Sequence, residues 1–116
     1  MVYIESVAFT RRLHRLAGDS ALEGLRSIQD DLLKNPSLGD LVRGLGGMRK
    51  ARCSNPARGK GKRGGFRYLY LYLEDRGHIH LLYLLDKNEQ ADLSGEERTA
   101  LRTLVEEIKR TKRGNS

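Results

Sequence analysis

The pattern of apolar and polar residues predicts two helices in the first third of the chain, after one short strand. Residues 2–6 alternate weakly, as in a strand, and Phe9, Leu13 and Leu16 share one face of a helix that ends near Gly18. A second helix follows and ends at Pro36, because the residue before a proline is displaced from helical backbone angles. Its predicted apolar face consists of Leu22, Leu25, Ile28, Leu32 and Leu33.

Strand signals dominate the middle of the chain. Residues 37–47 resemble a glycine-rich loop, and residues 48–53 indicate a strand after it. In FRYLYLYLE, at 66–74, Phe66 and three tyrosines alternate with Arg67 and three leucines, which predicts a strand with two distinct faces. A turn at 75–77 leads into HIHLLYLLD, whose apolar character on both faces is typical of a central strand in a hairpin.

Two capping boxes mark helix starts, in which a serine and a glutamate satisfy each other's free backbone N–H groups. Ser20 pairs with Glu23, and Ser94 pairs with Glu97 ahead of a last helix. The predicted order is β-α-α-β-β-β-α, an α+β fold with a small antiparallel sheet packed by N-terminal helices and a C-terminal helix. A chain of 116 residues suffices for one core, so we expect a single domain spanning 1–116, with a polar tail at about 111–116. The apolar face of the last helix consists of Leu101, Leu104, Val105 and Ile108.

Positive charge is concentrated in one segment, residues 43–67. Nine of the 22 lysines and arginines fall there and none of the 15 acidic residues, which leaves 13 basic and 15 acidic residues elsewhere. The formal net charge of +7 therefore comes from a single stretch rather than from an evenly basic surface. Such a concentration predicts a polyanionic partner, either nucleic acid or an anionic surface.

Several classes of function lack their sequence signals. Cys53 is the one cysteine, so the chain cannot form an internal disulfide, and we expect a half-buried strand residue in a protein of the reducing cytoplasm. No apolar stretch is long enough to span a membrane, and the first residues lack the apolar segment of a signal peptide. Metal-binding, P-loop and serine-hydrolase motifs are missing, so we expect no metal and no cofactor.

The basic loop ARGKGKR, at 57–63, interleaves glycine with lysine and arginine. Glycine lets backbone N–H groups approach phosphates closely, and the cations supply charge and forked hydrogen bonds. This composition suits the sugar–phosphate backbone of RNA, although a solvated basic loop would have the same composition. A cluster of cations would also stabilise the anionic transition state of RNA cleavage and lower the pKa of a lysine within it.

Two further groups of residues allow more than one interpretation. Tyr68, Tyr70 and Tyr72 could stack on bases, but such a stripe more often packs under helices or against a partner. His78 and His80 share one face of a strand and are most simply surface histidines, with RNA contact, acid–base work or a metal site as rarer alternatives.

Three blocks, at 46–52, 61–67 and 81–93, together resemble the RelE/ParE toxin superfamily, and KNEQADL at 87–93 is most similar to its HigB branch. The resemblance covers nearly the whole chain and implies a compact RelE-like fold. It implies a toxin of a type II toxin–antitoxin system that cleaves mRNA in the ribosomal A site without metal and so inhibits translation. It also implies a cognate antitoxin, commonly of the helix-turn-helix type, through which the pair contacts operator DNA.

Site residues follow from the resemblance by position. Arg67 and Lys87 would stabilise the phosphorane, and Lys62 or Lys50 would exchange protons; whether Lys60 or Lys62 is the lysine of the active site stays open. RNA and ribosome contacts are assigned to Arg49, Arg52, Arg58, Lys60 and Arg63. Two alternatives remain: a ParE-type toxin that inhibits gyrase, and a non-catalytic basic RNA-binding module.

Overall fold

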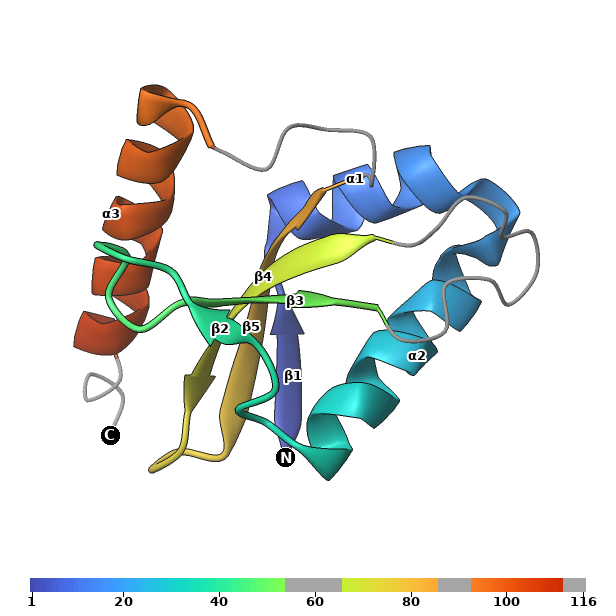
Figure 1. Ribbon diagram of the computed structural model, residues 1–116, viewed down its shortest axis with the longest axis horizontal. Helices are drawn as coiled ribbons and strands as arrows, with labels where there is room; N and C mark the ends of the chain where they lie inside the picture. The colour runs from blue at the N-terminus through green and yellow to red at the C-terminus, as the bar shows by residue number, and fades with distance from the viewer. Residues whose placement is uncertain (54–65, 86–92, 112–116) are drawn as a thin grey trace.

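The chain folds into a five-stranded sheet with helices on both of its faces (Figure 1). The computed structural model describes residues 1–53, 66–85 and 93–111. Its elements are β1 (Val2–Glu5), α1 (Val7–Ala17), the 3₁₀ helix η1 (Gly18–Ser20), α2 (Ala21–Lys34), β2 (Asp40–Leu41), β3 (Arg49–Arg52), β4 (Arg67–Leu73), β5 (His78–Leu85) and α3 (Gly95–Thr111). The α+β class is confirmed, and β2 is a short addition inside the segment predicted to be a loop.

The sheet is mixed, whereas the sequence predicted an antiparallel one. Its strand order is β1-β5-β4-β3-β2, and every neighbouring pair is antiparallel except β1 and β5, which run parallel. Ser6 begins α1 directly after β1, so no hairpin returns the chain beside β1. The neighbour of β1 in the sheet is β5, the last strand in the chain. A parallel pairing between such distant segments leaves no local turn signal in the sequence.

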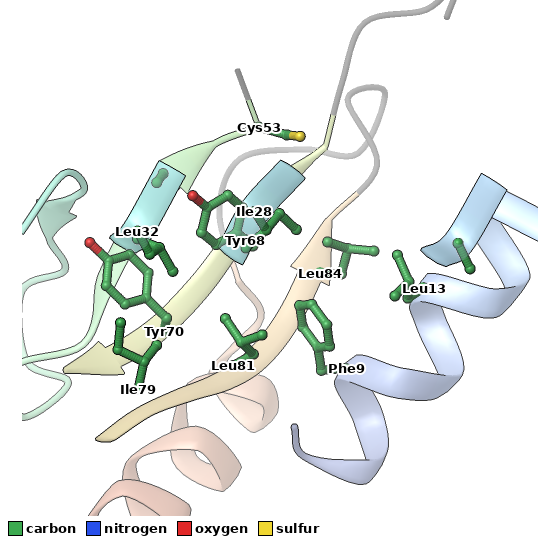
Figure 2. Packing of buried hydrophobic residues seen from close by; sticks show 12 residues of the cluster. Phe9, Leu13, Ile28, Leu32, Cys53, Tyr68, Tyr70, Ile79, Leu81 and Leu84 are labelled. Atoms are coloured by element: carbon green, nitrogen blue, oxygen red, sulfur yellow. The ribbon is translucent and has the colours of Figure 1, made fainter. Parts of the chain in front are cut away.

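The two predicted faces of β4 lie in two separate layers of the core. Tyr68 and Tyr70 are fully buried under α1 and α2, where they pack with Phe9 and Ile28 among others (Figure 2). The leucine face of β4 packs on the other side of the sheet, against α3 and the segment that precedes β3. The buried residues of this second layer are Leu45, Met48, Leu69, Leu71, Leu82, Leu101 and Val105.

The two predicted capping boxes behave differently. At α3, Ser94 Oγ accepts from the backbone N–H of Glu97 at 3.0 Å, and the Glu97 carboxylate accepts from the N–H of Ser94 at 2.8 Å. At α2, the side chain of Ser20 makes no capping hydrogen bond, and this prediction was wrong. The turn of η1 already leads into α2, so Ser20 lacks the extended backbone that a capping residue needs.

The apolar face of α2 is narrower than the sequence predicted. Ile28 and Leu32 are buried, whereas Leu22 and Leu33 are exposed. Cys53, which we expected to be a half-buried strand residue, lies directly after the end of β3 and is buried. None of the described helices is long and apolar enough to cross a membrane.

Candidate nucleic-acid interface

Strands β3 and β4 bring three of the predicted cationic residues to one face of the sheet. Arg52 lies opposite Arg67, and Lys50 lies opposite Leu69. Directly opposed residues of an antiparallel pair share a face, and Leu69 belongs to the layer on the α3 side. Lys50, Arg52 and Arg67 therefore project on the α3 side of the sheet, where Lys50 and Arg67 are half-buried and Arg52 is exposed.

A shallow hollow of about 350 Å³ lies over these cations. Its described lining comes from β3, from the first residue of β4, and from the segment Leu38–Asp40 that leads into β2. Asp40 lies opposite Lys50 across β2 and β3, so its carboxylate is on the same face as the cations. The hollow thus has a cationic wall of Lys50, Arg52 and Arg67 and a second wall of Leu38 and Asp40.

Arg49 lies on the opposite face, across from Tyr70, and the structure does not bring it into the hollow. Its guanidinium donates to the carbonyl oxygen of Gly39 at 2.7 Å and to that of Ser37 at 3.4 Å. These hydrogen bonds bind the segment before β2 to β3. The geometry favours a structural contribution from Arg49, although the resemblance assigned it to RNA.

Tyr70 holds the same segment from the core. Its hydroxyl donates to the carbonyl oxygen of Pro36 at 2.8 Å and accepts from the N–H of Gly39 at 3.0 Å. Burial raises the pKa of Tyr70, while the hydrogen bond from Gly39 and the charge of Arg49 act in the opposite direction. The phenol therefore stays protonated at neutral pH and keeps its donor for Pro36.

Position 39 has no room for a side chain, so only glycine fits there. A Cβ atom on Gly39 would lie 2.6 Å from the carbonyl oxygen of Lys50, closer than real contacts allow. The backbone of Gly39 therefore lies directly against β3, with both its N–H and its carbonyl group hydrogen-bonded by side chains. Asp40, the next residue, has its position fixed as a result.

The tyrosine stripe belongs to the core rather than to the hollow. Tyr68 and Tyr70 have no exposed surface, and Tyr72 is half-buried against the same cluster. Burial, with the charge of Asp31 as a smaller contribution, raises the pKa of Tyr68 strongly. Packing, one of the two interpretations that the sequence allowed, thus accounts for these tyrosines, and base stacking by Tyr68 or Tyr70 would require the core to open.

His78 and His80 lie near the start of β5, at the opposite end of the strand from Leu85, the partner of Arg67. Their ring centroids are 6.2 Å apart in an edge-on arrangement. Burial lowers the pKa of His80, and the neighbouring His78 and Arg76 lower it further. The described residues contain no group of three side chains suited to hold a metal ion, and neither histidine lines the hollow.

Five predicted site residues lie outside the described part of the chain: Arg58, Lys60, Lys62, Arg63 and Lys87. The structure in turn adds residues that the sequence did not indicate. Leu38 and Asp40 sit in a segment that we expected to be a plain loop, and the two-residue β2 has no periodicity to reveal it. Gly39 is the one residue there that could have drawn attention to this segment. Its close contact with β3, however, exists only in the folded chain.

No protein-family profile matches the sequence. Several solved structures are similar to it. A double mutant of the E. coli toxin RelE in the free state shares 13% identity with this chain at a TM-score of 0.56, with 88% of this chain and 93% of that chain covered. The chain has a RelE-like fold.

Two toxin–antitoxin complexes also match. The RelBE2 complex of Mycobacterium tuberculosis is similar at 20% identity and a TM-score of 0.55, over 73% of this chain and 95% of that chain. The intact RelBE complex of E. coli is similar at 15% identity and a TM-score of 0.53, over 77% and 98% of the two chains. In this RelE-like fold, the cationic hollow is formed by the edge of the sheet opposite to β1.

Proposed function

We propose that this chain is the toxin of a type II toxin–antitoxin system, of the HigB-like branch, and acts as a ribosome-dependent endoribonuclease on mRNA in the A site. The observation that carries the proposal is the pairing of Arg52 with Arg67 beside Lys50 in an open hollow of a RelE-like sheet. Opposed like charges destabilise a sheet. Their placement at one site is understandable if an anion such as an RNA phosphate neutralises them.

The reaction is transesterification within the RNA. The 2′-hydroxyl oxygen attacks the adjacent phosphorus and loses its proton, the bond to the 5′-oxygen breaks, and that oxygen takes up a proton. The products are a 2′,3′-cyclic phosphate and a free 5′-hydroxyl. Preorganised cations stabilise the negative charge that develops on the phosphorane, which is the largest contribution a site of this kind offers.

Each residue has a proposed part in this step. Arg67, held on the central strand β4, stabilises the phosphorane together with Lys87, and Lys50 or Lys62 exchanges the protons. Arg52 binds the neighbouring backbone phosphate, and Arg58, Lys60 and Arg63 extend the contact to mRNA and ribosomal RNA. Arg49 already donates hydrogen bonds to the carbonyl groups of Ser37 and Gly39, so any contact with RNA would be a second role for this residue.

The proposed partner is a cognate antitoxin of the helix-turn-helix class, which neutralises the toxin and carries the pair to operator DNA. Two of the structures with the same fold are complexes of a toxin with its antitoxin, which supports a protein partner of this type. The reaction needs neither a metal nor a cofactor in this proposal, and it takes place on cytoplasmic ribosomes.

The test is cleavage in a translating extract, mapped by primer extension on the mRNA. The wild-type protein should produce cuts that depend on translation, and Arg67→Ala should lose them. Arg26→Ala removes an exposed arginine on α2, which packs on the face of the sheet opposite to the hollow. It is the matched control and should cut normally. DNA breaks in the presence of gyrase would instead support the ParE-type alternative, and RNA binding without either product would support a non-catalytic module.

A further inference from the structure

The hollow contains a carboxylate that phosphate binding does not explain. Among the described lining residues, Asp40 is the one acidic side chain, and it lies opposite Lys50 on the same face as Arg52 and Arg67. Within the described part of the chain its carboxylate forms no ion pair and no hydrogen bond, and the side chain is exposed. A carboxylate repels phosphate and only accepts hydrogen bonds, so a nucleotide group that contacts Asp40 would do so through a hydrogen-bond donor.

The position of Asp40 is fixed by the fold. Gly39 is hydrogen-bonded by Tyr70 on its N–H side and by Arg49 on its carbonyl side, and its backbone touches that of Lys50. Tyr70 also holds Pro36, so the segment is attached to the sheet at both ends of its short course. A group held in this way is preorganised for binding, because little conformational freedom remains to be lost.

An apolar surface lies beside the carboxylate. Leu38 lines the same hollow and is 41% exposed, in a chain where most leucines of the sheet are buried. One wall of the hollow therefore offers cations, and the other offers a carboxylate with an apolar neighbour. A nucleotide has the matching two ends, a phosphate and a flat base with hydrogen-bonding groups on its edge.

We propose that Asp40 and Leu38 form the base-recognition wall of the site and that Asp40 selects guanine, an inference that rests on the proposed function. The two oxygens of a carboxylate accept two parallel hydrogen bonds. Guanine alone presents two adjacent donors on its Watson–Crick edge, N1–H and the N2 amino group. Adenine and cytosine pair one amino group with a ring acceptor, and uracil flanks its single N–H with two carbonyl groups, so each places an acceptor against the carboxylate.

Two measurements on the intact chain test the inference. The first maps cut sites in the translating extract for the wild type and for Asp40→Asn. The second measures the binding of fluorescent 2′-O-methyl hexanucleotides, which cannot be cleaved because the nucleophile is blocked, with one guanine, inosine, adenine or cytosine in a uridine background. Glu23→Gln, which removes a carboxylate from the first turn of α2, is the matched control.

The wild type should prefer guanine by roughly tenfold or more over inosine, which lacks the amino group, since a bidentate contact discriminates to that extent. Asp40→Asn should lose the preference and bind the uridine background equally well or better, because a negative charge leaves the hollow. Glu23→Gln should behave as the wild type. Leu38→Ala should weaken all the hexanucleotides alike without changing their order.

The possible failures are distinct. If Asp40→Asn and the wild type have the same base preference or the same distribution of cut sites, the inference about Asp40 is overturned. The proposed nuclease function still stands in that case if the wild type cleaves mRNA. A guanine preference that depends on Asp40, without any mRNA cleavage, overturns the nuclease and supports base recognition. A wild-type protein without guanine preference in both measurements contradicts the inference directly.

Discussion

Arg52 and Arg67 face each other across β3 and β4, at the wall of an open hollow. Neither arginine has an acidic partner among the residues that the structure describes. Directly opposed like charges cost stability in a sheet. Arg52 is exposed and Arg67 is half-buried, so neither is a fully packed core residue. The pair is a local conflict of the kind expected at a functional site.

Replacement of Arg67 should separate activity from stability. We expect Arg67→Ala to reduce mRNA cleavage about 10²-fold to 10³-fold, as the loss of one group that stabilises an oxyanion does. The same change relieves the repulsion with Arg52, so the free energy of unfolding should stay level or rise. Primer extension and urea denaturation measure the two effects. Wild-type cleavage by Arg67→Ala would exclude Arg67 from the catalytic group.

Replacement of Tyr70 should loosen the segment that carries Asp40. Tyr70→Phe leaves the buried N–H of Gly39 and the partly buried carbonyl of Pro36 without their partner, and a buried group left unpaired costs about 1–3 kcal/mol. Amide hydrogen exchange should quicken at Gly39. Tyr72→Phe is the control, because Tyr72 is half-buried and no hydrogen bond of its hydroxyl is found in the described residues. Equal stability of the two variants would show that the hydrogen bonds of Tyr70 contribute little.

Gly46 and Gly77 allow backbone strain to be separated from steric contact. Both have a positive φ, 65° and 68°, which an alanine adopts at a cost of about 1–2 kcal/mol. A Cβ on Gly46 would also lie 2.9 Å from Cγ1 of Val105 on α3, whereas a Cβ on Gly77 meets nothing within 4 Å. Gly46→Ala should therefore lower the free energy of unfolding by about 1–3 kcal/mol more than Gly77→Ala does, since overpacking adds to the strain. Thermal and urea unfolding of the two variants test the difference.

His80 should make stability depend on pH. Its pKa in the folded chain is lowered from the usual 6.5, chiefly by burial, and its Nε2 is buried without a hydrogen-bond partner in the described residues. The unfolded chain therefore binds the proton more tightly, so this contribution to stability is complete above about pH 6.5 and is lost as the pH falls toward the folded pKa. Urea unfolding between pH 5 and 8 should show this slope.

Two variants test whether His80 causes the dependence of the free energy of unfolding on pH. His80→Gln should flatten the dependence on pH, whereas His14→Gln, which changes an exposed histidine on α1, should keep it. An unchanged slope in His80→Gln would place the responsible group elsewhere in the chain.

Much of the fold could be predicted because local rules act strongly on this chain. The alternation of tyrosine and leucine along β4 predicted a strand with two distinct faces, and the structure places one under α1 and α2 and the other against α3. Ser94 and Glu97 form their predicted capping box, and Pro36 follows the end of α2. In each case the deciding interactions lie within a few residues or along one strand.

Features that depend on contacts between distant segments could not be predicted from these local rules. The parallel pairing of β1 with β5 joins residues more than 70 positions apart, and no local pattern encodes it. Ser20 has the composition of a capping residue, but the preceding 3₁₀ turn overrides it. Leu33 follows the helical period of α2 and is nevertheless exposed, because the sheet covers only part of that face.

The candidate site shows the same division. The sequence by itself determined that nine cations would lie between residues 43 and 67 and that Arg67 would lie at the start of a strand. Tertiary structure alone decided that Arg52, Arg67 and Lys50 share one face, that Arg49 turns to the other, and that Asp40 stands opposite Lys50. The physical reason is that composition and periodicity act along the chain, whereas register across strands is set by hydrogen bonds and close contacts, such as those of Gly39, that exist only after folding.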